Sequence, residues 1–165
     1  MPLRERDLVP PVVAHFLGLG YEVFAEVEIA SRWADLIAMG AEDVVAVELK
    51  VRDWRRAVRQ AMAYQLAADR SFVALPLRRA QEAYRRRHAF EVEGIGLLAV
   101  DAEGRVRTVL PSAPSPRRMP PLTEAVRRRL GGTGPRDAWR GPFGKEFPKT
   151  DGSRRGVRKG LSETD

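Results

Sequence analysis

The sequence predicts an α/β fold in which a mixed β-sheet is flanked by helices. The first 110 of its 165 residues alternate between short runs rich in β-branched residues and longer segments in which apolar residues recur at helical spacing. The expected order is helix, three strands, helix, strand, helix and two final strands. Strands joined by short turns pair antiparallel, whereas a strand reached through a crossing helix pairs in parallel. The sheet is therefore expected to be mixed, with helices on both faces.

The first expected element is a helix over residues 8–19, where the apolar positions have helical spacing. Pro10 and Pro11 are best tolerated in the first turn of a helix, so we expect the helix to begin beside them. It should end near Gly18 or Gly20, because glycine is common directly after a helix.

Three strands are expected next. Residues 21–29 alternate apolar and polar side chains, which predicts a half-exposed strand, and residues 32–39 predict a second strand. After a turn at residues 40–43, the stretch VVAVELKV at residues 44–51 is almost continuously apolar. Such a run is typical of a strand that is buried on both faces.

Two charged residues, Glu48 and Lys50, interrupt this apolar strand. Their side chains point the same way, roughly 6.6 Å apart along the strand, because side chains alternate between the two faces. Burying charges is costly unless a partner offsets them. Either this face is exposed to water and the pair is ordinary, or the charges are kept there for chemistry.

The second half of the domain is expected to contain two helices, a strand and a hairpin. Residues 71–76 predict a short strand, residues 77–88 a strongly basic helix, and residues 96–110 a β-hairpin with a glycine in its turn. Residues 54–68 predict an amphipathic helix. The expected apolar face of this helix is formed by Trp54, Val58, Ala61, Gln65 and Ala68.

We expect two regions: a domain over residues 1–110 and a basic extension over residues 111–165. The extension contains 8 Pro and 8 Gly, which is typical of low-complexity segments, apart from a helix expected at residues 122–130. Its 13 basic and 6 acidic residues account for the whole net charge of +7. We expect it to be partly flexible, and its charge suits either a solvated tail or a segment that binds polyanions.

Three aromatic residues of the extension, Trp139, Phe143 and Phe147, alternate with basic residues. This pattern is compatible with stacking on single-stranded nucleic acid. Packing of the same side chains against the domain is the alternative.

Composition excludes several classes of site. There is no cysteine, which excludes disulfides, thiolate zinc sites and cysteine nucleophiles. With only His15 and His88, a multi-histidine metal site is not expected. No apolar stretch approaches the ~20 residues needed to span a membrane, and the charged N-terminus does not resemble a signal peptide. We therefore expect no membrane partner and a cytoplasmic location.

Two carboxylates are expected to converge on neighbouring strands. Asp35 lies on the strand before Glu48, and a tight turn between antiparallel strands brings the two together. Carboxylate oxygens are the ligands that Mg²⁺ and Mn²⁺ prefer, and the backbone carbonyl of Leu49 could add another. A divalent cation would offset the cost of burying two negative charges, with Lys50 completing the balance.

The arrangement of Asp35, Glu48-Leu49-Lys50 and a following helix resembles the PD-(D/E)xK nuclease superfamily. The resemblance implies a restriction-endonuclease-like fold with an α-β-β-β-α-β core, which corresponds to residues 8–76. It also implies that Asp35 and Glu48 hold the metal and that Lys50 is the catalytic lysine. The residue before Asp35 is Ala34 where the motif name has proline, which makes the motif less specific.

The resemblance extends to two other helices. Gln60, in the helix after the motif, matches a glutamine that approaches the active site in many members. Arg56, Gln60 and Tyr64 are spaced so that one helical stripe could face the metal and a phosphate. Many members also have an extra metal-site acid on the first helix, for which Glu5 is the candidate, although the two prolines predict a helix that begins after it.

The expected function is therefore a Mg²⁺- or Mn²⁺-dependent DNA nuclease with Asp35, Glu48, Lys50 and Gln60 in its active site. We expect Arg56, Tyr64, Arg85 and Arg86 to contact DNA, with structure-directed or weakly sequence-specific recognition. Cleavage of both strands would call for a homodimer, because the length suggests one site per chain.

Two alternatives remain open at the level of sequence. The first is a catalytically inactive protein of the same fold that binds nucleic acid or acts as a scaffold. The second is an unrelated α/β domain in which Glu48 and Lys50 form a surface ion pair, worth about 0–1 kcal/mol.

Overall fold

The structure, a computed structural model, describes residues 2–131 of the chain. It is an α/β fold with a six-stranded mixed sheet in the order β1-β2-β3-β4-β5-β6. The strands β1 to β3 and the pair β5 and β6 are antiparallel, whereas β3, β4 and β5 run parallel. The predicted order of elements and the predicted mixed sheet are confirmed. The strands are β1 (Glu22–Ile29), β2 (Arg32–Met39), β3 (Val44–Leu49), β4 (Arg70–Pro76), β5 (Gly96–Val100) and β6 (Val106–Leu110).

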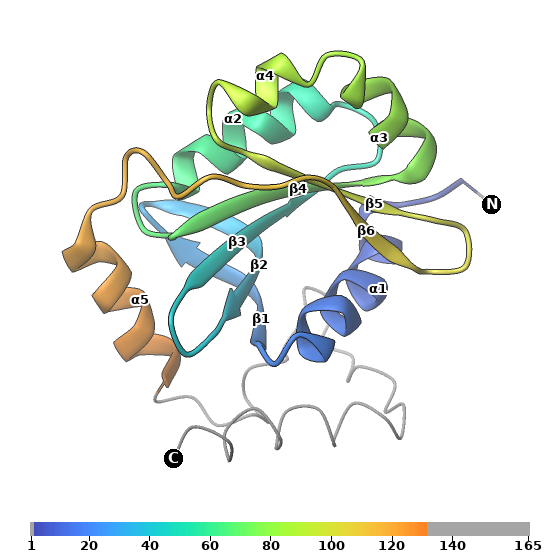
Figure 1. Ribbon diagram of the computed structural model, residues 1–165. Helices are drawn as coiled ribbons and strands as arrows, with labels where there is room; N and C mark the ends of the chain where they lie inside the picture. The colour runs from blue at the N-terminus through green and yellow to red at the C-terminus, as the bar shows by residue number, and fades with distance from the viewer. Residues whose placement is uncertain (1, 132–165) are drawn as a thin grey trace.

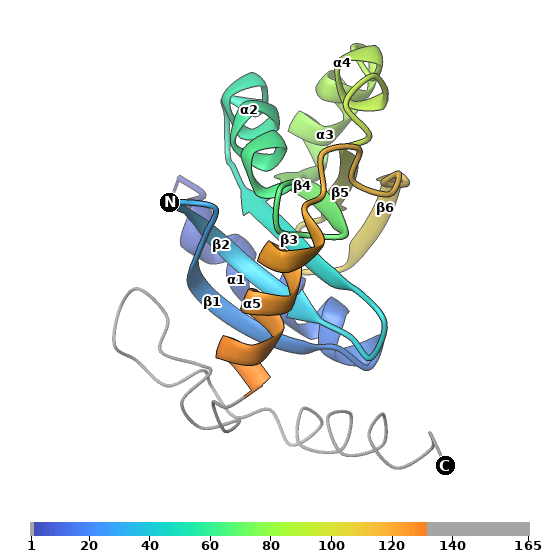
Figure 2. The ribbon, with the colours of Figure 1, turned by 90° about the vertical axis from the view of Figure 1, so that its left-hand side faces the viewer.

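Helices cover both faces of the sheet (Figure 1). One face is covered by α1, and the other is covered by α2, α3 and α4 at one end and by α5 at the other. Figure 2 shows α5 in front of β1 to β3, with α1 behind them. The helices are α1 (Glu5–Gly18), α2 (Trp54–Tyr64), α3 (Leu77–Tyr84), α4 (His88–Glu91) and α5 (Pro120–Gly131).

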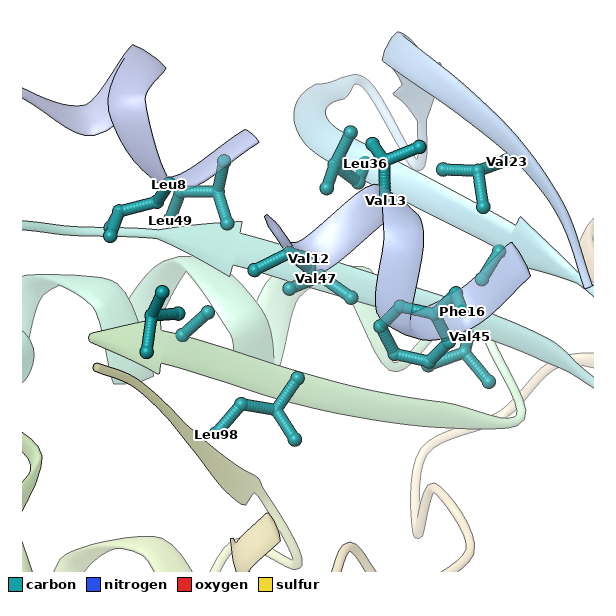
Figure 3. Packing of buried hydrophobic residues seen from close by; sticks show 13 residues of the cluster. Leu8, Val12, Val13, Phe16, Val23, Leu36, Val45, Val47, Leu49 and Leu98 are labelled. Carbon is teal, nitrogen blue, oxygen red and sulfur yellow. The ribbon is translucent and has the colours of Figure 1, made fainter. Parts of the chain in front are cut away.

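A cluster of buried apolar side chains closes the face under α1 (Figure 3). Leu8 and Val12 of α1 lie against Val47 and Leu49 of β3, and Phe16 lies over Val45. All of these side chains are at most 4% exposed. This cluster fixes α1, and with it the N-terminal end of the chain, against the middle of the sheet.

The predicted start of α1 is wrong. The helix begins at Glu5, so Pro10 and Pro11 lie inside it rather than in its first turn. The first turn is held by Asp7, whose carboxylate accepts a hydrogen bond from the Arg4 N–H at 2.8 Å, and by burial of Leu8. These interactions offset the two intrahelical hydrogen bonds that the prolines cannot donate.

The predicted face of α2 is confirmed in part: Trp54, Val58 and Ala61 are buried on the helix, whereas Gln65 and Ala68 are buried but follow its end. The helix ends at Tyr64 and not at Ala68, because the following residues turn toward β4. The single basic helix predicted at residues 77–88 is divided in two, with a turn after Tyr84.

Residues 111–131 pack on the sheet. The strap before α5 follows one end of the parallel strands, where the Ser115 N–H donates to the Asp69 carbonyl and the Met119 N–H to the Leu66 carbonyl, both at 2.8 Å. In α5, Val126 and Leu130 join the cluster that covers β1 to β3. The predicted helix is thus present, slightly longer than expected. Trp139, Phe143 and Phe147 lie outside the described residues, so their predicted roles stay predictions.

No helix within residues 2–131 is both long and apolar enough to cross a membrane.

Candidate metal-binding site

Asp35 and Glu48 lie side by side on neighbouring strands. Leu36 of β2 pairs with Val47 of β3, so Asp35 and Glu48 occupy the next cross-strand position. This face of the sheet lies under α2 and α5, opposite the face covered by α1. The strand register therefore brings the two carboxylates together, as the sequence predicted.

Asp35 is half-buried and is held by the backbone of the next strand. Its Oδ2 accepts a hydrogen bond from the Leu49 N–H at 2.8 Å. Burial raises the pKa of the Asp35 carboxyl, and the negative charge of Glu5 adds to this rise, while the Leu49 hydrogen bond and the positive charge of Lys50 oppose it.

Glu48 is the most buried charged side chain of the site, at 3% exposure. Its Oε2 accepts a hydrogen bond from the Tyr64 hydroxyl at 2.6 Å. Burial raises the pKa of the Glu48 carboxyl strongly, and repulsion from Asp35 raises it further. Two adjacent carboxylates with raised pKa values, one of them buried, favour either a proton or a cation between them.

The Tyr64 hydroxyl lies between two acceptors. It is 2.6 Å from Glu48 Oε2 and 2.7 Å from the Trp33 carbonyl oxygen, but it carries only one proton. When Glu48 is ionised, the hydroxyl donates to its carboxylate. When Glu48 is protonated, the carboxyl can donate to Tyr64, which then donates to Trp33. The protonation state of Glu48 is thus linked to the backbone of β2.

Lys50 lies at the rim of the site and contacts α1. Its Nζ is 3.5 Å from Glu5 Oε1, and its side chain is 16% exposed against 51% for Glu5. The two residues line one open cleft together with Arg56. Because α1 begins at Glu5, the candidate acid of the first helix does reach the site, through Lys50.

The predicted stripe on α2 does not face one surface. Arg56 is exposed, Gln60 is half-buried and Tyr64 is 1% exposed. The predicted contact of Tyr64 with DNA is wrong, because this side chain is enclosed by the core and its hydroxyl contacts Glu48. Gln60 Oε1 is a buried oxygen without a hydrogen-bond partner among the described residues, and it lies one helical turn before Tyr64.

The predicted DNA contacts Arg85 and Arg86 lie in a different cleft. They line it together with Trp54, Arg55 and Arg87, next to α4. This cleft shares no residue with the one at Lys50. The positive charge of Lys50 acts on both Asp35 and Glu48, so these three residues lie together, and the two arginines lie outside the group.

Two features of the β1–β2 hairpin were not predicted. Glu26 lies opposite Asp35, between the pairs Ala25–Leu36 and Val27–Ala34, and its φ is 49°, a left-handed value that is uncommon for a residue with a side chain. On both strands the alternation of faces changes at this position. The other feature is that the Trp33 carbonyl accepts a hydrogen bond from the Tyr64 hydroxyl, which no side-chain pattern indicates. The break at Glu26 is also invisible in the sequence, which alternates regularly there.

Comparison of the chain with protein-family models, curated proteins and solved structures finds no match. Within residues 2–131, no three His, Cys, Asp or Glu side chains are grouped as a metal site. The chemistry of the site is therefore argued from Asp35, Glu48 and their neighbours alone.

Proposed function

We propose that the protein is a metal-dependent DNA nuclease of the PD-(D/E)xK type. The observation that supports this most is the adjacent pair of carboxylates formed by the half-buried Asp35 and the buried Glu48, with Lys50 at the same end of β3. Carboxylates in this setting cost free energy unless a proton or a cation offsets their charge, and groups with such raised pKa values are common at functional sites. A surface ion pair between Glu48 and Lys50 does not account for them, because Glu48 is buried and Lys50 contacts Glu5.

The order of the elements also supports a restriction-endonuclease-like core. The run α1-β1-β2-β3-α2-β4 is the α-β-β-β-α-β order that the resemblance implies. The carboxylates lie where β2 and β3 meet, and α2 follows β3 directly.

The residues present suit Mg²⁺ or Mn²⁺. Magnesium is commonly held by one or two carboxylates, with water and substrate phosphate as its other ligands, so Asp35 and Glu48 suffice without a third acid. The N–H and C=O of an extended residue point to the same neighbouring strand, so the carbonyl of Leu49 is directed with its N–H toward Asp35. The unpartnered Oε1 of Gln60 is a further oxygen donor near Tyr64.

The roles of the side chains follow from their contacts. A divalent cation bound by Asp35 and Glu48 would stabilise negative charge on a phosphodiester and acidify water. Tyr64 orients Glu48 through its hydroxyl, and the Leu49 N–H orients Asp35. Lys50 supplies a positive charge beside the phosphate and helps to position the attacking water, and its contact with Glu5 holds the ammonium at the rim.

DNA would approach from the open cleft that Lys50 lines with Arg56. Both cations suit phosphate contacts that position the backbone without reading sequence. Arg85 and Arg86 would hold a more distant part of the same strand or duplex. One carboxylate pair per chain would cut one strand, so a double-strand break would need two copies.

The second candidate is a nucleic-acid-binding protein that keeps this fold without cleaving. Two observations favour it: the ammonium of Lys50 contacts Glu5, and no third acid joins the carboxylates within residues 2–131. In this alternative the cleft at Arg56 and the cleft at Arg85 and Arg86 would still bind DNA.

The deciding experiment is cleavage of supercoiled plasmid, single-stranded DNA and branched DNA in Mg²⁺, Mn²⁺ or chelator. We expect metal-dependent cleavage that Asp35→Ala and Lys50→Ala both abolish. Asp35→Ala should also abolish metal binding measured by calorimetry, whereas Lys50→Ala should retain binding of metal and DNA. Arg107→Ala, on the exposed strand β6, is the control and should cleave normally. DNA binding without cleavage, unchanged in Lys50→Ala, would leave only the second candidate.

A further inference from the structure

Every exposed residue of α2 is an arginine. These residues are Arg55, Arg56 and Arg59, and the helix contains no acidic residue. Asp53, at the N-cap, is used by the backbone, since it accepts a hydrogen bond from the Arg56 N–H at 3.1 Å. Within residues 2–131, none of the three guanidinium groups forms an ion pair. This face of α2 therefore carries positive charge to which no carboxylate of the described chain is paired.

This arrangement of arginines lowers the stability of α2. Arg59 follows Arg55 by four residues and Arg56 by three, so the three side chains are neighbours on one face and repel one another. Arg55 and Arg56 also lie in the first turn, where the helix dipole is positive and favours acidic side chains instead. A polyanion bound along this face would offset both costs, because negative charge would neutralise the repulsion and interact favourably with the start of the helix.

The same arginines join the two clefts described above. Arg56 lines the cleft at Lys50, whereas Arg55 lines the cleft beside α4. Adjacent residues of a helix point about 100° apart, so the two clefts open on either side of the first turn of α2. Arg59, one turn further along, points between them. Figures 1 and 2 show α2, α3 and α4 together on one side of the sheet, so the basic surface is continuous from the cleft at Lys50 to α4.

The distribution of charge along the chain favours a polyanion at this surface. Residues 2–49 contain 3 basic and 9 acidic residues, whereas residues 50–91 contain 11 basic and 4 acidic residues. The part of the chain that includes α2, α3 and α4 therefore attracts a polyanion, and the part that includes α1, β1 and β2 repels it. An anionic membrane is a poorer partner, because a helix that binds a membrane inserts its apolar face, and that of α2 is buried against the sheet.

We propose that the arginines of α2 form a track for the phosphate backbone of nucleic acid, which leads from α4 to the carboxylate site at Asp35 and Glu48. The proposal rests on the proposed function for the identity of the polyanion. It adds the path of the backbone across the first two turns of α2, with contacts to phosphates that do not read the bases. Arg55 is positioned before the nucleic acid arrives, because its guanidinium lies 4.3 Å from the centre of the Trp54 ring.

The test is the salt dependence of duplex DNA binding by the full chain, measured by fluorescence anisotropy in chelator. One phosphate contact contributes about 0.9 to the slope of log affinity against log salt concentration, which corresponds to about 8-fold in affinity for a tenfold change in salt. Arg55→Gln and Arg59→Gln should each lower the slope by about 0.9, and the double variant by about twice as much. The losses should be the same for two duplexes of unrelated sequence, because phosphates carry no sequence information.

Arg59→Glu separates a binding role from a structural one. The new carboxylate would lie one turn from Arg55 and would replace repulsion by attraction, so the unfolding temperature should rise while DNA binding weakens by more than in Arg59→Gln. A lower unfolding temperature together with weaker binding would mean that Arg59 acts through the fold, and would overturn the proposal for this residue.

Arg107→Gln is the matched control. It removes the same charge from an exposed arginine of the edge strand β6, which lines neither cleft, so it should leave the slope unchanged. Slopes in Arg55→Gln and Arg59→Gln that equal the slope of this control would overturn the proposal. Loss of binding to phosphatidylserine vesicles in the same variants, with DNA affinity unchanged, would also overturn it and assign the surface to a membrane.

The two proposals can fail separately, because the binding assay requires neither metal nor cleavage. Metal-dependent cleavage with unchanged slopes would leave the nuclease and remove the track. Lowered slopes without cleavage by the wild-type protein would keep the track as the surface of a nucleic-acid-binding module.

Discussion

The two faces of β3 have opposite properties, although they belong to one short strand. On the face under α1, Val45, Val47 and Leu49 belong to a cluster of buried apolar side chains (Figure 3). On the other face, Val44 and Ala46 are equally buried, but the third position is Glu48. The first face stabilises the fold. On the second face, burying the Glu48 carboxylate beside Asp35 lowers the stability of the folded state.

The largest effect should come from the apolar face. Leu49→Ala leaves a cavity against Leu8 and should lower the free energy of unfolding by about 2–5 kcal/mol, measured by urea denaturation. Leu19→Ala, at an exposed position, should change it by no more than about 0.5 kcal/mol. Equal effects of the two substitutions would mean that α1 does not seal this face.

The carboxylate face should respond to pH. Burial raises the pKa of Asp35 to about 6 and that of Glu48 to about 8, above their ordinary values in the unfolded chain. Between about pH 4 and 8 the folded state therefore binds more protons than the unfolded state, so stability of the metal-free protein falls as pH rises, by at most about 1.4 kcal/mol per unit for each proton.

Glu48→Gln separates this effect from other titrations. It should remove much of the slope and make the protein more stable at pH 8, by about 1–3 kcal/mol in urea denaturation with chelator. The lowered pKa of His15 gives a slope of the opposite sign below about pH 6.5, which both proteins share, so the difference between them isolates Glu48. Parallel curves for the two proteins would contradict the assignment.

Tyr64→Phe tests the connection between the carboxylate and the hairpin. Removing the hydroxyl takes away the polar partner that contacts both Glu48 and the Trp33 carbonyl and that donates to one of them, which should cost about 1–2 kcal/mol. Tyr84→Phe, at an exposed ring, is the control and should cost almost nothing. If the two substitutions were equivalent, the hydroxyl of Tyr64 would not be holding Glu48.

The smallest expected effect is at Glu26. Its left-handed backbone suits glycine, so Glu26→Gly should stabilise the protein by about 0.5–1 kcal/mol. Glu26→Ala keeps the Cβ atom and should not gain this energy, as thermal unfolding of both variants would reveal. A gain in the alanine variant would instead assign the effect to the loss of a negative charge near Asp35.

Strands were easier to predict from the sequence than the limits of the helices. The bounds of β2 agree with the sequence because turns flank a compact run of apolar residues. The start of α1 does not, because local proline rules were outweighed by burial of Leu8 on the sheet and by the Asp7 cap. Tertiary packing decided that boundary, and the sequence pattern contains no direct measure of it.

In the site, too, local sequence predicted some features and tertiary packing decided the others. The proximity of Asp35 and Glu48 follows from strand register, which short turns determine. The contact between Tyr64 and Glu48 depends on how α2 crosses the sheet, and the acceptor at Trp33 is a backbone atom that any residue would provide. Side-chain identity therefore indicated the two acids but not the group that orients one of them.

The position of α5 has a consequence for how the chain folds during synthesis. Its residues Val126 and Leu130 cover β1 to β3, which leave the ribosome about ninety residues earlier. Until α5 emerges, Phe24 and Ile37 are covered by Tyr64, Ala67 and Ala68 but lack Val126 and Leu130, so part of this apolar face is exposed in the nascent chain. A chain that stops before Pro120 would keep the carboxylate pair but lack α5, and its exposed apolar surface would favour aggregation.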